Sequence, residues 1–292
     1  MSSATDPVTI QCVYGSSHIR HIEECLIPAL SRSTKRPIRF ITINYNPSSP
    51  DRVKSGLRFG LEIVDLKNES PSVTGFAHNH NLMFKYGNPL DNFVIINPDC
   101  IPHINSIDVL IKRMEKTDGR VAIVEGRQWP FEHPKEYDPL TLHTPWASGA
   151  FSLIDAEFYR SIGGMDDIYF LYMEDVDLSW QAWLNGYSVI YEPEASITHF
   201  TGWRFYRDDI LYPEQYFSLR NFIIISKKFF GECGEKEAIR RLMNLQDNEL
   251  AKMAIHEYEI FFKQRVTKKY ESKRHDNVKI LGLGIFHILR EN

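Results

Sequence analysis

Three carboxylates crowd into four consecutive positions near the middle of the chain, within Phe170 to Leu178 (FLYMEDVDL). They belong to Glu174, Asp175 and Asp177. Carboxylates this close repel one another, so they are stable together only if they are solvated, protonated, or balanced by cations or helix-terminal N–H groups. The simplest interpretation is a helix that begins with an acidic first turn. The alternative is a catalytic base beside a site that binds a metal ion and a phosphate group.

A second acid follows a predicted strand. Asn97-Pro98-Asp99 comes directly after the apolar run 93–96. An acid at the carboxyl end of a strand can help to bind a divalent cation such as Mg²⁺, which prefers a few protein oxygens together with phosphate oxygens. His199 follows another predicted strand, and its imidazole is a second candidate ligand. Taken alone, Asn-Pro-Asp is more simply a turn and a lone His more often structural.

A glycine marks the entry to a predicted helix in the segment 72–81 (SVTGFAHNHN). Gly75 lacks a Cβ and therefore permits a ligand to approach the backbone closely. The N-terminus of the helix that follows favours a phosphate or a polar base. The segment is a weak candidate for a nucleotide contact.

Strands that alternate with helices over the first 125 residues predict a doubly wound α/β sheet. Ligands in such sheets bind outside the carboxyl ends of the strands, where the candidate residues above are found. The predicted strands are 8–13, 38–43, 61–66, 92–96, 121–125, 148–154 and 187–191. The predicted helices are 22–30, 76–86, 106–114, 155–162 and 176–185. The aromatic segment 126–146 is expected to be a functional loop, and the chain beyond 201 to be mostly helical.

The composition is that of a globular protein, with 292 residues, 43% hydrophobic and 25% charged. Residues 201–292 hold 17 Lys and Arg against 13 Asp and Glu, so this part is mildly basic although the whole chain carries −4. That balance suits an anionic lipid or glycan and is too weak to indicate nucleic acid. Four scattered cysteines predict neither a zinc site nor a redox motif, and a reduced compartment is the default.

The N-terminus shows no signal-peptide pattern, and no apolar run approaches the roughly 20 residues that span a bilayer. We therefore expect a cytoplasmic protein, with peripheral contact at the cytoplasmic face of the membrane as a further option.

Three motifs, in this order, resemble glycosyltransferase family 2 and, within it, the rhamnosyltransferase-like branch. They are GFAHNHN at 75–81, IINPDC at 95–100, and the long block 148–199 that contains the acidic cluster. The resemblance covers roughly residues 8–230. It implies a GT-A fold, which is a mixed sheet flanked by helices, together with a nucleotide-diphosphate sugar donor. It also implies a divalent cation, Mg²⁺ or Mn²⁺, and inversion at the anomeric carbon.

Within this resemblance, Asp175 matches the general base, and Asp99 and His199 match the metal-binding residues. The residues expected on the donor side are Tyr14, Asn44, Gly75, Asn81, Asn97 and Arg204. The segment TGWRFYRDD is either a lid, from which Arg204 or Arg207 reaches the diphosphate, or a plain surface loop. The residues expected on the acceptor side are Glu174, Asp177, Trp146, Ser148 and Gly149. For Glu174 and Asp177 the alternatives are that they tune the base or cap the helix.

The chain departs from the family pattern at three places. Tyr14-Gly15 stands where the family has Tyr-Asn, Asn44 where it has an Asp, and Gln181 where it has an Arg. These departures concern the donor side more than the fold, so a rhamnosyl donor is not assumed.

We expect a catalytic domain at 1–205, with a nucleotide-sugar half at about 1–125 and an acceptor half at about 126–205. A C-terminal helical extension is expected at 206–292. Its segments 216–230 and 279–290 mix apolar with basic residues. Each is predicted to be a peripheral membrane anchor, to pack on the catalytic domain, or to form a homodimer interface.

The expected function is inverting, metal-dependent transfer of a sugar from a dTDP- or UDP-linked donor to a glycan or lipid-linked saccharide, in polysaccharide biosynthesis of the cell envelope. One alternative is a sugar nucleotidyltransferase, although YGSSHIR after the first strand is a poor match to the Gly-rich basic loop of such enzymes. The other is a catalytically silent protein of the same fold that binds a nucleotide sugar or a glycan.

Overall fold

The computed structural model describes residues 6–130, 132, 136–200, 212–245, 249–267, 270 and 273–278, with the side chains of the 212–245 segment described from residue 215 onward.

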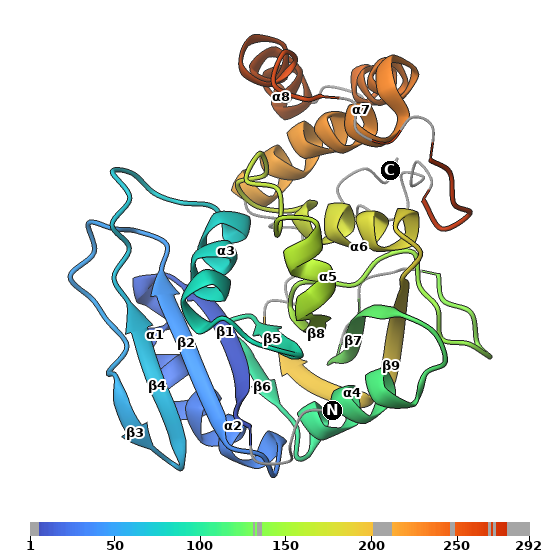
Figure 1. Ribbon diagram of the computed structural model, residues 1–292. Coiled ribbons are helices and arrows are strands. Elements are labelled where there is room, and N and C mark those ends of the chain that lie inside the picture. The colour runs from blue at the N-terminus through green and yellow to red at the C-terminus, as the bar shows by residue number, and fades with distance from the viewer. Residues whose placement is uncertain are drawn as a thin grey trace.

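A single nine-stranded mixed sheet organises the catalytic part of the chain (Figure 1). The strand order is β3-β4-β2-β1-β5-β8-β7-β9-β6. Strands β4, β2, β1 and β5 are parallel, β8 is antiparallel to both of its neighbours, and β9 is parallel to β7. The strands are β1 (Val8–Tyr14), β2 (Ile38–Asn44), β3 (Gly56–Arg58), β4 (Leu61–Leu66), β5 (Asn92–Ile96), β6 (Cys100–Pro102), β7 (Val121–Trp129), β8 (Phe151–Asp155) and β9 (Ser188–His199).

Helices cover both faces of this sheet (Figure 1). Buried residues of α2 and α4 join one apolar core, and those of α3, α5 and α6 join another. The α-helices are α1 (Ile19–His21), α2 (Ile27–Ser33), α3 (Phe76–Gly87), α4 (Ser106–Lys116), α5 (Ala156–Ser161), α6 (Glu174–Leu184), α7 (Tyr212–Met243) and α8 (Glu249–Glu257). Short turns of other helix types are η1 (Ser16–His18), η2 (Ile22–Leu26) and η4 (Tyr258–Phe262).

Strand β5 shows why the central strands read as continuous apolar runs. Val94 and Ile96 pack into the core under α2 and α4, whereas Phe93 and Ile95 pack into the core under α3, α5 and α6. Successive side chains point to opposite faces, and both faces are covered, so the four positions after Asn92 are all apolar. The predicted strands 61–66 and 92–96 therefore match β4 and β5 in their bounds.

The structure differs from the predicted elements mainly around β9. This strand continues to His199, where the sequence predicts an end at 191. A bulge lies opposite Gly126 and Arg127, which pair with Glu192 and Ser196, and it breaks the alternation that marks a strand. The short edge strands β3 and β6 are also additional, and α6 begins two residues early, at Glu174.

The C-terminal extension packs against the catalytic part through α7. Leu219, Phe222 and Ile225 of α7 belong to one buried cluster with Val176 and Trp180 of α6. The segment 216–230 thus packs against α6, which agrees with one of the three predictions made for it. Its apolar side is therefore not available as a membrane anchor. In the part of the chain that is described, no helix has the length and apolar character needed to cross a bilayer. The segment 279–290 lies outside the described residues.

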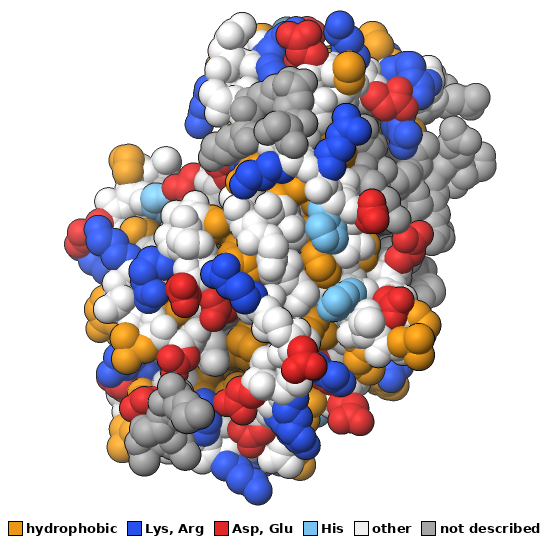
Figure 2. Space-filling view, turned by 45° about the vertical axis from the view of Figure 1, so that its right-hand side comes forward, with side chains coloured by type: hydrophobic (Ala, Val, Ile, Leu, Met, Phe, Trp, Pro, Cys, Tyr) orange, Lys and Arg blue, Asp and Glu red, His pale blue; other side chains and the backbone are white. Residues whose placement is uncertain are grey.

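One face of the molecule is shown in space-filling form in Figure 2. Acidic and basic side chains alternate over this face, and no broad patch of one sign forms on it. A continuous basic surface, which nucleic-acid backbones require, is therefore not seen from this side.

A buried ion pair links α7 to α6. The Lys228 ammonium lies 2.6 Å from Asp177 Oδ2 and 2.6 Å from Asp166 Oδ2, and its side chain is only 3% exposed. Burial by itself lowers the pKa of Lys228, but the two carboxylates outweigh burial and leave the pKa raised. The pair is therefore ionised, and it ties the extension to the helix that begins with the acidic cluster.

We expect Lys228→Met to destabilise the protein strongly, because Asp177 would remain buried without a cation. Breaking a buried pair in this way costs about 3–5 kcal/mol. Chemical denaturation measures the loss. Arg20→Gln is the matched control, since Arg20 pairs with Glu24 on the surface, and its midpoint should stay unchanged. A Lys228→Met protein as stable as the wild type would contradict the structural role of the pair.

Candidate functional site

The acidic cluster occupies the first turn of α6, which follows a constrained stretch of backbone. Tyr172 and Met173 have φ angles of 69° and 75°, in the left-handed region that non-glycine residues rarely adopt. Asn221 of α7 donates hydrogen bonds of 2.7 Å to the carbonyls of Leu171 and Tyr172. Such a backbone conformation persists only where neighbouring structure holds it in place, and here α7 does so through Asn221. The extension therefore positions the start of α6.

Asp175 is the half-buried acid of the cluster. Its Oδ2 accepts a hydrogen bond of 3.0 Å from the backbone N–H of Gly149, and its Oδ1 accepts one of 2.8 Å from Val176. Backbone N–H donors and a helix N-terminus favour the ionised carboxylate. Asp175 thus combines a stabilised charge with access from outside, as a general base requires.

Glu174 is 5% exposed, and its Oε2 makes no hydrogen bond to any described residue. Burial, followed by repulsion from Asp175 and Asp177, raises the pKa of Glu174 well above its usual range. The protonated form is therefore favoured. The predicted acceptor contact by this residue is contradicted, because the side chain is enclosed beside the base.

Asp177 is fully buried and is surrounded by donors. Tyr169 donates to its Oδ2 at 2.8 Å, and Gln181 donates to its Oδ1, in addition to the contact with Lys228. The predicted acceptor role of Asp177 is wrong for the same reason as that of Glu174: the carboxylate faces the protein interior. Its role is to attach α6 to α7.

The candidate metal ligands are brought together by a strand that the sequence does not reveal. In the antiparallel pair of β6 and β9, Cys100 stands opposite His199. Asp99 Oδ1 consequently lies 3.4 Å from His199 Nε2, and both side chains are largely buried. Burial tends to raise the pKa of Asp99, but contact with His199 outweighs burial and leaves the pKa below its ordinary value.

The hydrogen bonding of His199 fits a cation at this place. Gln128 Oε1 accepts from His199 Nδ1 at 2.7 Å, so Nε2 is directed at the Asp99 carboxylate. A protonated imidazole pairs with Asp99, and a neutral imidazole presents the lone pair of Nε2 to a cation. Nε2 is buried and makes no hydrogen bond to a described residue. Two electron-rich atoms in this arrangement are candidate ligands of a cation, and Gln128 orients the imidazole.

Cys100 also has its ligand atom within 4.8 Å of those of Asp99 and His199. However, burial and then the charge of Asp99 raise the pKa of the thiol well above its ordinary value, and Sγ donates to Ala150 O at 3.7 Å. A protonated, buried thiol is a poor ligand for a hard cation. The donor set thus consists of an oxygen and an imidazole nitrogen, which suits Mn²⁺ or Mg²⁺.

The backbone at Gly149 and Ala150 connects Asp175 to the candidate metal ligands. Gly149 N–H binds Asp175, and the next residue, Ala150, accepts from Asn97 N–H at 2.9 Å. Asn97 begins the turn that holds Asp99. Asn97 thus lies beside the candidate metal ligands. Its half-buried side chain remains a candidate for contact with the donor. Gly149 acts through its N–H, and its place beside Asp175 is compatible with acceptor contact.

Two other predicted acceptor contacts are buried. Trp146 belongs to the apolar cluster formed with α6 and α7. The Ser148 hydroxyl accepts from Ala150 N–H at 3.2 Å. Both residues support the Gly149 turn from inside, and their predicted contact with an acceptor is contradicted by this burial.

On the donor side, Tyr14 and Asn44 stand opposite each other at the carboxyl ends of β1 and β2. Both are buried. The Tyr14 hydroxyl donates to Asp65 Oδ1 at 3.0 Å, and Asn44 donates to the carbonyl of Asp51 at 3.2 Å. Direct donor contact by these two side chains is therefore contradicted, because their polar groups are already used within the protein.

Asp65, at the end of β4, was not predicted from the sequence. Besides Tyr14, its carboxylate accepts from Thr42 at 2.7 Å and pairs with Arg52. This network fixes the loop 45–55 that follows β2. A lone Asp in a strand of ordinary composition gives no sequence signal of such a role.

Gly75, which precedes α3, and Asn81, within α3, contact the neighbouring segment 165–170. A Cβ at Gly75 would lie 2.4 Å from the Phe170 carbonyl oxygen, so close backbone packing explains the glycine. The Asn81 amide donates to Met165 O and to Asp167, and its oxygen accepts from Tyr159. The predicted donor role of Asn81 stays a prediction, although its half-buried side chain already forms these hydrogen bonds within the protein. Arg204 lies outside the described residues.

We expect Glu174→Gln to flatten the pH dependence of stability. An unfolded Glu ionises near its ordinary pKa of 4.5, whereas buried Glu174 stays protonated to higher pH. Above the ordinary pKa the unfolded chain binds fewer protons at this position, so wild-type stability falls as pH rises toward the raised pKa. Gln cannot ionise and removes this fall.

Denaturation from about pH 5 to about pH 8 should therefore show the variant gaining stability relative to the wild type. Glu115→Gln, at an exposed position of α4, is the control and should show a constant difference. A constant difference for Glu174→Gln as well would mean that Glu174 is ionised in the folded protein.

No family model matches the chain. A segment of 87 residues is 31% identical to the N-acetylglucosaminyl-diphospho-decaprenol L-rhamnosyltransferase of Mycobacterium tuberculosis, with the same values for the CDC 1551 / Oshkosh and ATCC 25618 / H37Rv strains. The match spans 28% of this chain and 28% of the length of those relatives.

Solved glycosyltransferase structures share the fold. GalNAc-T7, solved with UDP, GalNAc and Mn²⁺, has a TM-score of 0.56 at 13% identity, over 88% of this chain and 55% of its own. The mannosyltransferase PcManGT of Pyrobaculum calidifontis, solved with GDP-Man and Mn²⁺, has a TM-score of 0.53 at 15% identity, over 89% of this chain and 77% of its own. Staphylococcus aureus TarS 1–349, solved with UDP-GlcNAc, has a TM-score of 0.51 at 9% identity, over 87% of this chain and 73% of its own.

These structures show the arrangement of the sheet and helices found here, and the ordered motifs and the aligned segment agree with it. The chain therefore has the GT-A fold of these glycosyltransferases.

Proposed function

We propose that the chain is an inverting, metal-dependent glycosyltransferase. The observation that supports this most directly is the half-buried Asp175 carboxylate, which accepts backbone N–H groups and is attached through Gly149 and Ala150 to the turn that holds Asp99. A base and a cation site on one rigid frame are what transfer from a nucleotide-diphosphate sugar needs.

In the proposed reaction, Asp175 accepts the proton of an acceptor hydroxyl while that oxygen forms a bond to the anomeric carbon. The bond from this carbon to the diphosphate breaks in the same displacement, which inverts the configuration. Asp99 and His199 would hold the divalent cation, which supplies positive charge to the departing diphosphate. Protonated Glu174 keeps a further negative charge away from the base, and buried Asp177 keeps α6 in place.

The identity of the substrates is a narrower proposal. Two of the structural relatives were solved with UDP or UDP-GlcNAc, and the sequence relative is named for transfer to a diphospho-decaprenol saccharide. These names support a UDP- or dTDP-linked donor and a glycan or lipid-linked saccharide acceptor in polysaccharide biosynthesis.

We expect Asp175→Asn to lower the rate of transfer by about 10²–10⁴-fold, which is the usual contribution of a general base. Its affinity for the nucleotide sugar should remain, because the donor diphosphate is bound elsewhere. Release of nucleotide from a panel of UDP- and dTDP-sugars, with and without saccharide acceptors, measures the rate. Calorimetric titration measures the affinity.

Asp118→Asn, an exposed acid beyond α4, is the matched control and should keep the wild-type rate. Full activity of Asp175→Asn would exclude Asp175 as the base. If the wild-type chain fails to turn over any nucleotide sugar, a silent binding protein of this fold becomes the better description.

We expect Mn²⁺ to raise the melting temperature of the wild type by several degrees, because a ligand that binds the native state stabilises it. Asp99→Asn and His199→Gln should lose this rise. Cys100→Ala should retain it, since the protonated thiol is not a ligand in our assignment. Differential scanning fluorimetry with and without a chelator makes the comparison, and an undiminished rise in Asp99→Asn would remove the metal assignment.

A further inference from the structure

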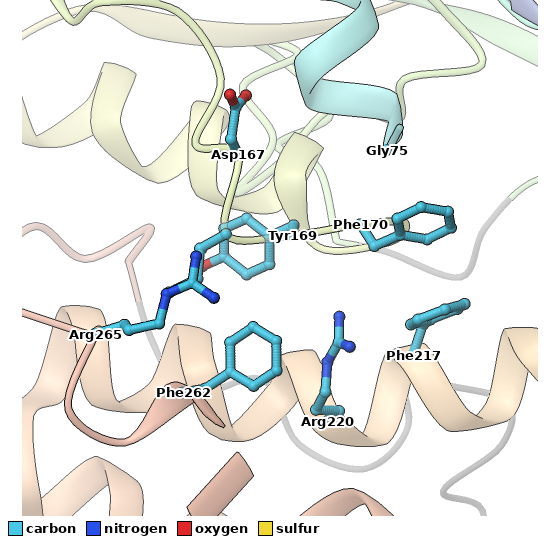
Figure 3. A pocket seen from close by; sticks show the side chains of 9 residues that line it. Gly75, Asp167, Tyr169, Phe170, Phe217, Arg220, Phe262 and Arg265 are labelled. Carbon is cyan, nitrogen blue, oxygen red and sulfur yellow. The ribbon is translucent and has the colours of Figure 1, made fainter. Parts of the chain in front are cut away.

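A cavity of about 320 Å³ separates the C-terminal helices from the catalytic part of the chain, beside Gly75 at the start of α3 (Figure 3). Two cations and several aromatic rings line it. They are Arg220, Arg265, Tyr169, Phe170, Phe217 and Phe262. In Figure 3, the guanidinium groups of Arg220 and Arg265 point into the space between α7 and the segment 167–170.

The positive charge of this cavity is incompletely balanced. Arg220 is 4% exposed, and its nearest acid in the described chain is Glu257, 3.5 Å away. Burial and then the charge of Arg265 lower the pKa of Arg220 to about 10, and burial also raises the pKa of Glu257. Within the described residues Arg265 forms no ion pair with an acid. The two guanidinium groups thus repel each other, and among the described residues Asp167 is the acid that lines the space.

Asp167, the acid that lines the cavity, interacts with α3 and not with the two arginines. Asp167 accepts from Asn81 at 2.9 Å and lies 3.2 Å from His78 Nδ1, both on α3. Figure 3 shows its carboxylate directed away from the two arginines. The charge that faces the space between α7 and the segment 167–170 is therefore positive.

The walls of the cavity are apolar. The rings of Phe170 and Phe217 lie 5.1 Å apart, and the Arg220 guanidinium carbon lies 4.9 Å and 4.6 Å from the rings of Phe217 and Phe262. A pocket of this kind, with apolar walls and two fixed donors, selects a small anion joined to a less polar group. Guanidinium groups match phosphate oxygens in charge and geometry.

The cavity adjoins the base and not the metal ligands. Phe170 accepts from Phe76 N–H at 2.8 Å, and a Cβ at Gly149 would lie 3.2 Å from the Phe76 ring. Gly149 in turn binds Asp175. Neither Asp99 nor His199 lines the cavity. A ligand here would approach the site from the side of the base, which is the side of the acceptor.

We propose that this cavity binds a phosphate group of the acceptor, so that a saccharide attached to that phosphate presents its hydroxyl to Asp175. The proposal rests on the glycosyltransferase function above and assigns the acceptor to the class of phosphate-linked saccharides. Arg220 and Arg265 bind the phosphate, and the phenylalanine rings contact the group beside it.

Calorimetric titration of the full chain in EDTA tests this site without donor, metal or turnover, so the result does not depend on catalytic activity. The probes are N-acetylglucosamine 1-phosphate, neutral methyl N-acetylglucosaminide and methyl glucuronide. The wild type should bind the sugar phosphate most tightly. Arg265→Gln, at an exposed position, should weaken that binding roughly tenfold. Lys236→Gln, an exposed cation of α7 outside the cavity, should not change it.

Three results would overturn the proposal. Equal affinity for the sugar phosphate and the neutral glycoside would show that phosphate is not recognised. Glucuronide binding as tight as that of the sugar phosphate would assign the cavity to carboxylates. Loss of binding in Asp99→Asn, with Arg265→Gln unaffected, would place the phosphate at the metal ligands instead.

Discussion

The acidic turn at the start of α6 can exist only because its three carboxylates are neutralised in three different ways. Glu174 is buried and favours its proton, Asp177 pairs with Lys228, and Asp175 accepts backbone N–H groups. Repulsion between unscreened charges at such short range would otherwise oppose the turn. This division leaves one carboxylate, that of Asp175, both ionised and accessible. The candidate catalytic site follows from that selection.

The C-terminal helices take part in this balance. Lys228 supplies the cation for Asp177, and Asn221 of the same helix fixes the left-handed backbone before Glu174. This arrangement accounts for Gln181, which stands where the resembling family has an Arg. Gln181 donates to Asp177 and accepts from Tyr270 at 2.7 Å, while the positive charge comes from α7. The extension thus belongs structurally to the site of the base.

Local patterns in the sequence predict the elements and the order of the motifs well. The strand β5 contains an apolar run that is buried on both faces, and Asp155 caps α5 as its position before the helix indicates. Contacts between residues that are far apart in the sequence cannot be predicted from local patterns. Lys228 is 51 positions from Asp177, and β6 has only three residues. Tyr14 binds Asp65 and Asn44 binds the Asp51 carbonyl, so side chains expected to face a ligand instead form hydrogen bonds within the protein.

The protonation states within the acidic turn test the account most directly. Carbon-13 NMR of the side-chain carboxyls, assigned with the Glu174→Gln and Asp175→Asn proteins, reports each state separately. The account predicts that at neutral pH the Glu174 carboxyl is protonated while the Asp175 carboxyl is ionised. An ionised Glu174, or a protonated Asp175, under these conditions would contradict it.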